Sequence, residues 1–193
     1  MNPPYKKISS SSEHRRALRA SGVETVNLYA GFVALALKQL EHEGELVAII
    51  PRSFCNGPYY LPFREILLKE SAIKHIHIFD SRNNAFYDDK VLQENVIIHL
   101  VKGAKQQDVT ITSSPAADFY IEEESNTVTV DDMTIRSVAF ERIVNPLDKQ
   151  KFIHIAANER DQAVIDKLNT FNNTLDSLDI QVSTGPVVDF RLK

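Results

Sequence analysis

The chain has 193 residues, of which 43% are hydrophobic and 25% charged, with 6 Gly and 8 Pro. This composition is typical of a globular protein and excludes collagen-like, wholly disordered and coiled-coil classes. The single cysteine, Cys55, excludes a disulfide within the chain. No apolar run reaches the roughly 18 residues that span a bilayer, and the first residues lack the apolar stretch of a signal peptide. These features predict a soluble, cytoplasmic protein with no membrane partner.

The formal net charge is −4, which by itself argues against a nucleic-acid partner. The charge is unevenly distributed, however, because residues 1–20 carry five basic side chains and one acidic side chain. DNA binding depends on the local field of one face rather than on the total charge. The composition is therefore compatible with a DNA-binding surface.

The first half of the chain begins with a loop and then alternates helix and strand. The serines at 9–12 lie among basic residues and predict a mobile, solvated loop. Residues 26–40 are apolar at helical spacing and predict a mostly buried helix, which Gly44 ends. The apolar run 46–50 stops at Pro51 and predicts a short strand buried on both faces.

The same order then repeats. Pro58 and Pro62 flank the start of a second predicted helix, and strands are expected at 73–79 and 96–101. The polar loop between these strands is too short for a parallel crossover, so the last strand should run antiparallel to its neighbour. Helix, strand, helix, strand, strand is part of a layered α/β sheet.

Beyond Gly103 the pattern changes to short β-rich segments between polar turns. Strands are predicted at 109–111, 119–121 and 128–130. A helix is expected at 159–175, with Val164, Leu168, Phe171 and Leu175 on one side. Residues 182–188 predict a further strand and turn.

The segment Asn2-Pro3-Pro4-Tyr5, here called the Asn2–Tyr5 corner, has features suited to binding an amine. Its prolines fix φ and have no N–H donor, so they form a stiff corner whose carbonyls can accept hydrogen bonds. The Asn2 side-chain oxygen and such a carbonyl suit one NH₂ group, and the Tyr5 ring suits a planar base. Holding both N–H bonds frees the nitrogen lone pair to attack an electrophilic methyl group. By themselves, the four residues indicate no more than a turn.

The corner is one of four segments that occur in a characteristic order. They are Asn2–Tyr5, Asn27–Phe32, Leu46–Tyr60 and Asp80–Val96. Together they closely resemble the adenine-N6-specific DNA methyltransferases of bacterial restriction–modification systems, over about residues 2–103 and more faintly to the end. The resemblance implies a partial S-adenosylmethionine-dependent methyltransferase sheet, Rossmann-like in fold, followed by a connecting segment of β-strands and a helix.

The resemblance also implies how the target base is held. Asn2 and the Pro3 carbonyl, in the corner that Pro4 completes, would hold the amine of an adenine flipped out of double-stranded DNA. Tyr5 would stack on the base. Phe86, in the loop between the last two strands, would pack on the flipped adenine, although it also suits a core anchor.

Cofactor and DNA contacts are expected at four further positions. Phe32 would line the pocket for the adenine part of S-adenosylmethionine, although its place on an apolar helical stripe also fits a core residue. Lys6, Lys7 and Arg52 are candidate DNA contacts, and Arg52 equally suits an ion pair with a surface carboxylate.

Two other features suggest no chemistry. His75 and His77 share one side of a predicted strand, but no third ligand is evident, so no metal site is predicted. Cys55 has no neighbouring His to activate it and is expected to be a small buried residue.

The family carries a Gly-rich strand–loop–helix and an acidic residue upstream of the corner, which hold the cofactor, and neither precedes Asn2 here. Residues 1–103 are therefore expected to be the C-terminal half of a methyltransferase catalytic domain. Residues 104–193 would be a β-rich connecting segment that leads to a truncated target-recognition region. We expect such a fragment to be inactive alone.

Two other functions stay open. A non-catalytic binding or assembly module would self-associate or pair with a chain that carries the missing half, because missing strands leave an open sheet edge and apolar faces. The corner also occurs in methyltransferases that act on protein glutamine or on RNA bases, and only the resemblance of residues 52–60 favours the DNA enzymes.

Overall fold

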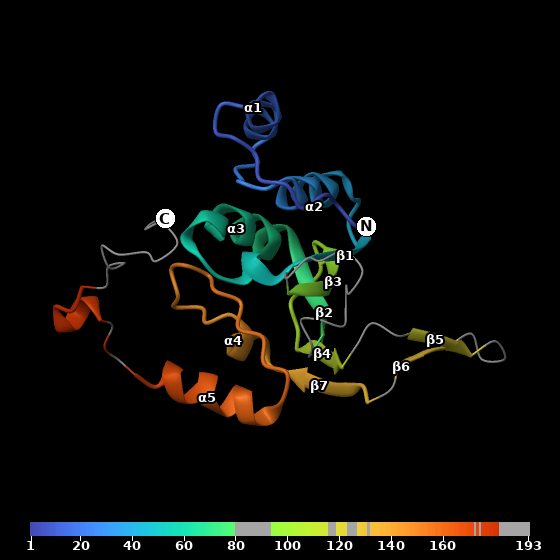
Figure 1. Cartoon of the computed structure of the whole chain (residues 1–193), viewed down its shortest axis with the longest axis vertical. Coiled ribbons are helices and arrows are strands. Elements are labelled where there is room, and N and C mark those ends of the chain that lie inside the picture. The colour runs from blue at the N-terminus through green and yellow to red at the C-terminus, as the bar shows by residue number, and fades with distance from the viewer. Residues whose placement is uncertain are drawn as a thin grey trace, which may run out of the picture. The chain divides into compact units, whose positions relative to one another are not determined.

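The computed structural model describes residues 1–79, 94–115, 119–122, 127–130, 132–171, 173 and 175–181. These belong to two compact units, Met1–Ala157 and Asn158–Lys193, which are considered separately. The first unit holds a five-stranded sheet with helices packed on it and a separate two-stranded sheet (Figure 1). The predicted α/β class is confirmed.

The large sheet has the strand order β1-β3-β2-β4-β7. Its strands are β1 (Glu45–Pro51), β2 (Ser71–Phe79), β3 (Asn95–Lys102), β4 (Val109–Ser114) and β7 (Thr134–Val138), while β5 (Phe119–Glu122) pairs with β6 (Thr127–Val130). β3 runs antiparallel to both β1 and β2, which confirms the antiparallel strand predicted at 96–101. β4 is parallel to β2, and β7 is antiparallel to β4.

The helices of the first unit lie before, between and after these strands. They are α1 (Glu13–Ala20), α2 (Leu28–Gln39), α3 (Leu61–Glu70) and α4 (Phe140–Ile143), with the 3-10 turns η1 (Arg52–Cys55) and η2 (Pro58–Tyr60). The two long helices predicted from the sequence are confirmed. The helix α1 was not predicted. It begins after Ser12, whose side chain accepts a hydrogen bond from the Arg15 N–H at 3.2 Å, and Leu18 is its buried residue. It is short and mostly polar, so it carries no apolar run that would have marked it as a core helix.

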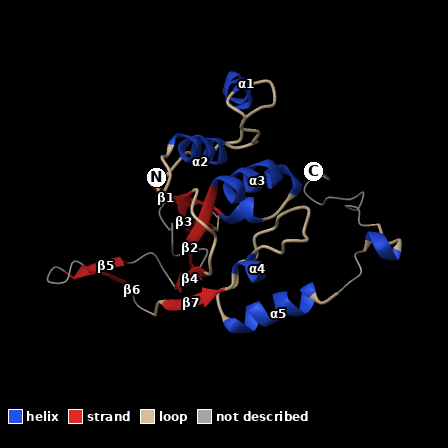
Figure 2. Ribbon diagram, turned by 180° about the vertical axis from the view of Figure 1, so that it is seen from behind, coloured by secondary structure: helices blue, strands red, loops and turns tan. Residues whose placement is uncertain are grey.

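The helices α2 and α3 pack on one face of the large sheet (Figure 2). The strand residues on that face are fully buried, among them Ala48, Ile98 and Ile76, which lie side by side in register. The opposite face is more open, and Val47 is 50% exposed. The prediction that residues 46–50 are buried on both faces is therefore wrong. Successive strand residues point to opposite faces, and the described helices cover one of them.

The loop between β1 and α3 is fixed by Arg64, which is fully buried. Its guanidinium donates hydrogen bonds to the carbonyls of Phe54, Asn56, Gly57 and Gln150, at 2.8 to 3.2 Å. The ring of Phe152 lies under it, with Cζ 5.1 Å from the ring centroid. Burial lowers the pKa of Arg64, but arginine stays charged in proteins. One cation thus ties α3 to two loops.

Two imidazoles on β2 bind hydroxyl groups on β4. His75 Nε2 and His77 Nδ1 lie 2.7 and 2.8 Å from the same Thr112 Oγ1, and His77 Nε2 lies 3.1 Å from Ser114 Oγ. Burial, and next the nearby His99, lowers the pKa of His75 below its ordinary value. Both histidines reinforce the parallel β2–β4 pairing, and the lowered pKa favours the neutral form of His75.

The described part of the second unit holds α5 (Glu159–Asn169) and the 3-10 turn η4 (Asp176–Leu178). Asn158 caps α5 by accepting a hydrogen bond from the Asp161 N–H at 2.9 Å. The helix predicted at 159–175 is present but ends earlier, at Asn169. Its expected apolar side is exposed, at Val164, Leu168, Phe171 and Leu175.

The sheet continues past Gly103, because β4 pairs with β2 and β7 in turn pairs with β4. The division into residues 1–103 and 104–193 stays a prediction, and the first compact unit ends at Ala157. The strand and turn predicted at 182–188 lie outside the described residues. Within the described ranges, no helix has the length and apolar character needed to cross a membrane.

Replacing Arg64 with Met should lower the free energy of unfolding by about 3 kcal/mol, because buried carbonyls lose their donor. Urea unfolding followed by circular dichroism measures this. The matched control is Arg16→Met on the exposed surface of α1, for which we expect little change. Equal stability of the two variants would contradict the proposed role of Arg64.

The pKa of His75 predicts a pH dependence with a definite sign. Because this pKa is lower in the folded state, the unfolded chain binds more protons once the pH falls below about 6.5. Stability should therefore decrease on acidification, and His75→Gln should show a smaller decrease. The comparison is between urea midpoints at about pH 7.5 and about pH 5.5. The same decrease in both proteins would exclude His75 as its source.

Candidate active site

The Asn2–Tyr5 corner begins at the outer edge of the large sheet. The Met1 ammonium donates a hydrogen bond to the Val47 carbonyl, and the Ile49 N–H donates to the Met1 carbonyl at 3.1 Å. This is the bonding pattern of parallel strands. The corner therefore leaves the sheet toward the carboxyl end of β1, and α/β sheets bind their ligands at that end.

Tyr5 folds back on the corner. Its hydroxyl lies 3.2 Å from the Asn2 amide oxygen and 3.1 Å from the Ile49 carbonyl, so its single proton can be donated to either acceptor. Burial raises the pKa of the Tyr5 phenol, which keeps this proton in place. Asn2 itself is exposed. The corner thus offers an exposed amide oxygen beside a hydroxyl that can orient it.

The residues after the corner are tied to the start of α2. The Leu28 N–H donates to the Lys6 carbonyl, and the Ile8 N–H donates to the Val26 carbonyl, each at 2.9 Å. These bonds fix the backbone on either side of Lys7. The side chains of Lys6 and Lys7 are exposed. Two cations therefore follow the corner on a backbone that is held in place.

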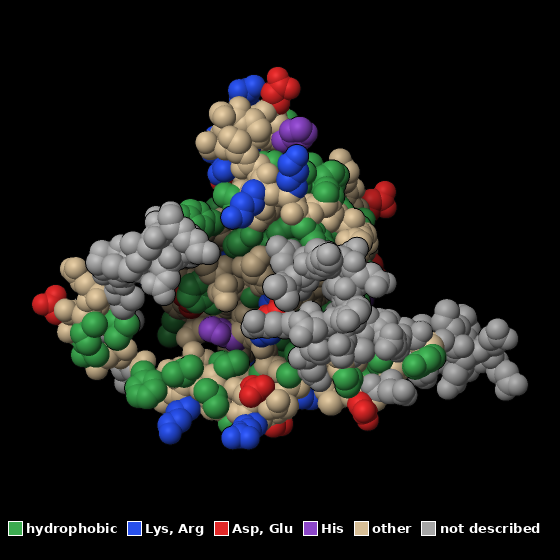
Figure 3. All heavy atoms as spheres, in the orientation of Figure 1, with side chains coloured by type: hydrophobic (Ala, Val, Ile, Leu, Met, Phe, Trp, Pro, Cys, Tyr) green, Lys and Arg blue, Asp and Glu red, His purple; other side chains and the backbone are tan. Residues whose placement is uncertain are grey.

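The basic residues of α1 are partly neutralised. Arg19 and Arg15 both bind the Glu24 carboxylate, and these hydrogen bonds hold the pKa of Glu24 below its ordinary value. Arg16 lies 3.8 Å from Glu13 in an exposed pair. Figure 3 shows the Lys and Arg side chains gathered around α1 at the top of the molecule. Because two arginines share one carboxylate, this region keeps a positive charge.

Three tyrosines from distant parts of the chain form a continuous wall, here called the aromatic wall: Tyr5, Tyr29 of α2 and Tyr60 of η2. The Tyr29 ring lies edge-on to Tyr5, with 6.2 Å between centroids, and stacks on Tyr60 at 6.0 Å. The Tyr29 hydroxyl lies 3.2 Å from Ser53 Oγ, and Asn27 Nδ2 donates to the Tyr60 hydroxyl. The wall joins the corner to the loop after β1.

The sequence prediction gave no role to Tyr29, Tyr60 or Asn27. All three lie in segments that carry the resemblance, and this was the available signal. A tyrosine in a buried helix otherwise indicates core packing. Burial raises the pKa of the Tyr29 phenol far above its ordinary value, so it acts as a neutral hydrogen-bonding group.

Phe32 lies on α2 and its side chain is 47% exposed. It is therefore not a core residue, which was the alternative interpretation. With Leu18 and Leu35 it lines a groove of about 210 Å³ between α1 and α2. Gly31 permits this close approach, because a Cβ there would lie 2.9 Å from Leu18 Cδ1. An exposed ring beside an apolar groove fits contact with the planar adenine of a cofactor.

Arg52 forms contacts within the first unit. Its Nη2 donates to the Ile155 carbonyl at 2.7 Å, and its Nη1 lies 3.6 Å from the Glu94 carboxylate. The ion pair that the sequence suggested as an alternative is therefore present, and DNA contact by Arg52 stays a prediction. Phe86 lies outside the described residues.

Cys55 is buried, as expected, and burial raises the pKa of its thiol to about 12. The thiol therefore stays protonated and unreactive. His75 and His77 bind the hydroxyls of β4. Among the residues that the structure describes, no group of three or more His, Cys, Asp or Glu side chains could hold a metal ion.

The aromatic wall predicts different effects for two changes at Tyr29. Tyr29→Phe keeps the ring and loses the Ser53 contact, so stability should fall by about 1 kcal/mol. Tyr29→Leu removes the ring between Tyr5 and Tyr60, and the expected loss is about 3 kcal/mol. Urea unfolding distinguishes the two. If the Phe variant were as unstable as the Leu variant, the hydroxyl rather than the ring would support the wall.

These segments are similar to those of known proteins. Residues 1–86 match the model of the Eco57I restriction-modification methylase. Over its whole length, the chain is 51% identical to the type II methyltransferase M.BsuBI of Bacillus subtilis and 47% identical to the type II methyltransferase M.PstI of Providencia stuartii. It spans 36% of the length of each relative.

A solved structure has a similar fold. The methyltransferase subunit of a type I restriction-modification system from Streptococcus thermophilus matches with a TM-score of 0.52 and 21% identity, over 79% of this chain and 36% of that one. The resemblance to restriction–modification methyltransferases stated from the motifs is confirmed: residues 1–86 are similar to the Eco57I restriction-modification methylase family.

Proposed function

We propose that this chain is part of a site-specific DNA adenine-N6 methyltransferase of a restriction–modification system. The observation that carries the proposal is the Asn2–Tyr5 corner, which stands at the carboxyl edge of the sheet with an exposed amide oxygen beside an aromatic wall. The relatives named above are type II methyltransferases.

The chemistry follows from the corner. The exocyclic amine of adenine is a poor nucleophile, because its lone pair is delocalised into the ring. Asn2 Oδ1 and the Pro3 carbonyl would each accept one N–H, which favours a pyramidal nitrogen and an available lone pair. When Asn2 binds the amine, the Tyr5 hydroxyl would donate its hydrogen bond to the Ile49 carbonyl instead of to Asn2, because this carbonyl lies 3.1 Å away. The Tyr5 ring would pack on the base.

The cofactor and the second aromatic contact complete the proposed site. S-adenosylmethionine, when bound, supplies the electrophilic methyl group. Phe32 would hold the adenine part of this cofactor in the groove beside α1, because its ring is exposed there. Phe86 would pack on the flipped adenine. We expect the enzyme to act in the cytoplasm on double-stranded DNA.

The exposed cations near the corner are the proposed phosphate contacts. Lys6 and Lys7 follow the corner directly, on a backbone fixed to α2. They would bind phosphates beside the extruded adenine and fix the register of the strand without reading its sequence. Arg52 is a weaker candidate, because its guanidinium already binds the Ile155 carbonyl.

An assembly role is a second candidate, supported by a different observation. Val47 on β1 is 50% exposed, and β1 stands at the outer edge of the described strands. Such an edge favours pairing with a further segment, within one protein or between chains. Sedimentation at increasing protein concentration tests self-association. A monomer at every concentration would contradict this role for the isolated chain.

A chimera tests the proposed activity. Residues 1–193 would replace the matching 51% identical segment of M.BsuBI, and mass spectrometry would detect N6-methyladenine in a DNA substrate. Asn2→Ala should lower kcat by about 100-fold, because an acceptor used in the transition state is lost. The control, Asn145→Ala, removes an amide that accepts from the Leu147 N–H elsewhere in the unit. Methylation unchanged by Asn2→Ala would refute the assigned role.

A further inference from the structure

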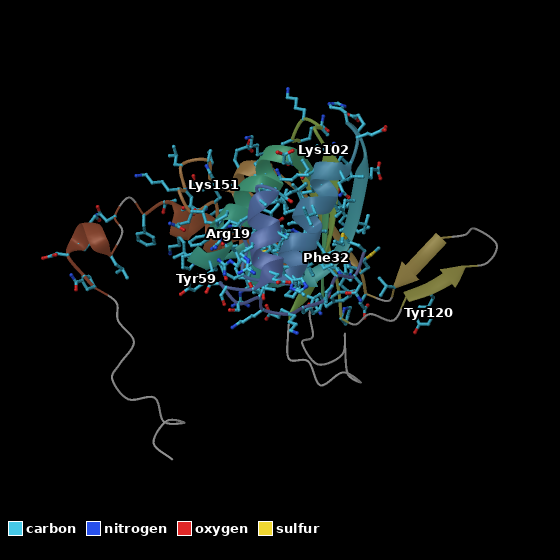
Figure 4. The ribbon with its side chains drawn as sticks, turned by 90° about the horizontal axis from the view of Figure 1, so that it is seen from above. Arg19, Phe32, Tyr59, Lys102, Tyr120 and Lys151 are labelled. Carbon is cyan, nitrogen blue, oxygen red and sulfur yellow. The ribbon has the colours of Figure 1, made fainter. Side chains whose placement is uncertain are left out.

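The Ser53–Tyr60 loop, between β1 and α3, presents one aromatic side chain to solvent. Phe54 and Cys55 point inward and are buried, whereas Tyr59 is 74% exposed. Figure 4 shows Tyr59 at the periphery of the first unit. No role for this side chain follows from the Asn2–Tyr5 corner or from the packing of the core.

The loop that carries Tyr59 is rigidly held. Arg64 donates to the Phe54, Asn56 and Gly57 carbonyls, and the Ile153 N–H donates to the Cys55 carbonyl at 2.9 Å. A ring on a fixed backbone loses little conformational freedom when it binds a partner. The loop therefore presents Tyr59 in a way that suits recognition.

The same loop adjoins the proposed base site. Tyr60, the next residue, stacks on Tyr29, which lies edge-on to Tyr5. The Asn27 amide also binds the Tyr60 hydroxyl. Tyr59 therefore lies in the loop that follows β1 and is the sequence neighbour of Tyr60, a member of the aromatic wall.

We propose that the Ser53–Tyr60 loop is a further DNA-contacting surface, in which Tyr59 stacks on a base of the target strand. This inference rests on the proposed function. Aromatic side chains can stack on any base, because every base has a π-face. The contact would therefore add affinity rather than sequence specificity. The phosphates of the same strand would lie within the positive field of Lys6, Lys7 and the helix α1.

The chain has no tryptophan, so Tyr59→Trp gives it a single fluorescent reporter. Titration with a short single-stranded oligodeoxyadenylate avoids the cost of flipping a base out of a duplex. Saturable quenching of this tryptophan is the expected result. The control is Tyr120→Trp, because Tyr120 is also exposed, at 55%, but lies on the separate β5–β6 sheet. Absence of binding, equal quenching at both positions, or binding without quenching at Tyr59→Trp would each overturn the proposal.

Affinity and catalysis give a second measurement. Tyr59→Ala should weaken binding of a labelled oligodeoxyadenylate about tenfold in fluorescence anisotropy, while Tyr59→Phe should keep it. Tyr120→Ala should leave it unchanged. In the chimera, Tyr59→Ala should raise KM for DNA and preserve kcat.

The two proposals fail differently. If adenine methylation depends on Asn2 but DNA affinity does not depend on Tyr59, the further inference alone is wrong. If the oligonucleotide quenches the reporter but the chimera methylates no adenine, the proposed reaction is wrong and the DNA-contacting loop stands.

Discussion

The buried guanidinium of Arg64 is the interaction on which the rest of the candidate site depends. In the described part of the chain its hydrogen bonds go to backbone carbonyls, and the Phe152 ring covers it. Carbonyl dipoles can replace water around a buried cation when several of them converge. These hydrogen bonds offset the cost of burying the charge. They also fix a loop that has no regular secondary structure beyond short 3-10 turns. Arg64 thereby couples α3 to the carboxyl end of β1.

Aromatic contacts connect this loop to the Asn2–Tyr5 corner. The Tyr60 ring stacks on Tyr29, and the Tyr29 ring lies edge-on to Tyr5. Backbone pairing supports the corner independently, through Met1 on β1 and through Lys6 on the start of α2. Three segments that are distant in sequence therefore determine where one amide oxygen points.

The sheet is asymmetric in a way that bears on function. The helices α2 and α3 cover one face, and on the other face Val47 is exposed and His75 and His99 are partly exposed. The two β2 histidines use hydroxyls of β4 as partners, and His77 and these hydroxyls are buried. The chain spans 36% of the length of M.BsuBI, and the described side of α5 that carries Val164 and Leu168 is exposed.

The sequence by itself determined much of this protein. Hydrophobic patterns located α2, α3 and the strands β1 to β6, because burial of a regular element repeats at short, fixed intervals. They did not locate β7, where four of the five residues are not buried. The order of the motifs identified the corner and the resemblance to restriction–modification methyltransferases, because the four segments occur in a characteristic sequence. Tertiary structure alone decided the rest. The sequence missed α1, whose single buried residue, Leu18, gives no period, and it assigned two buried faces to β1, because a run of apolar residues does not say what covers it. The partners of Arg64 and the aromatic wall also emerged only from the fold, since contacts between distant segments leave no local pattern.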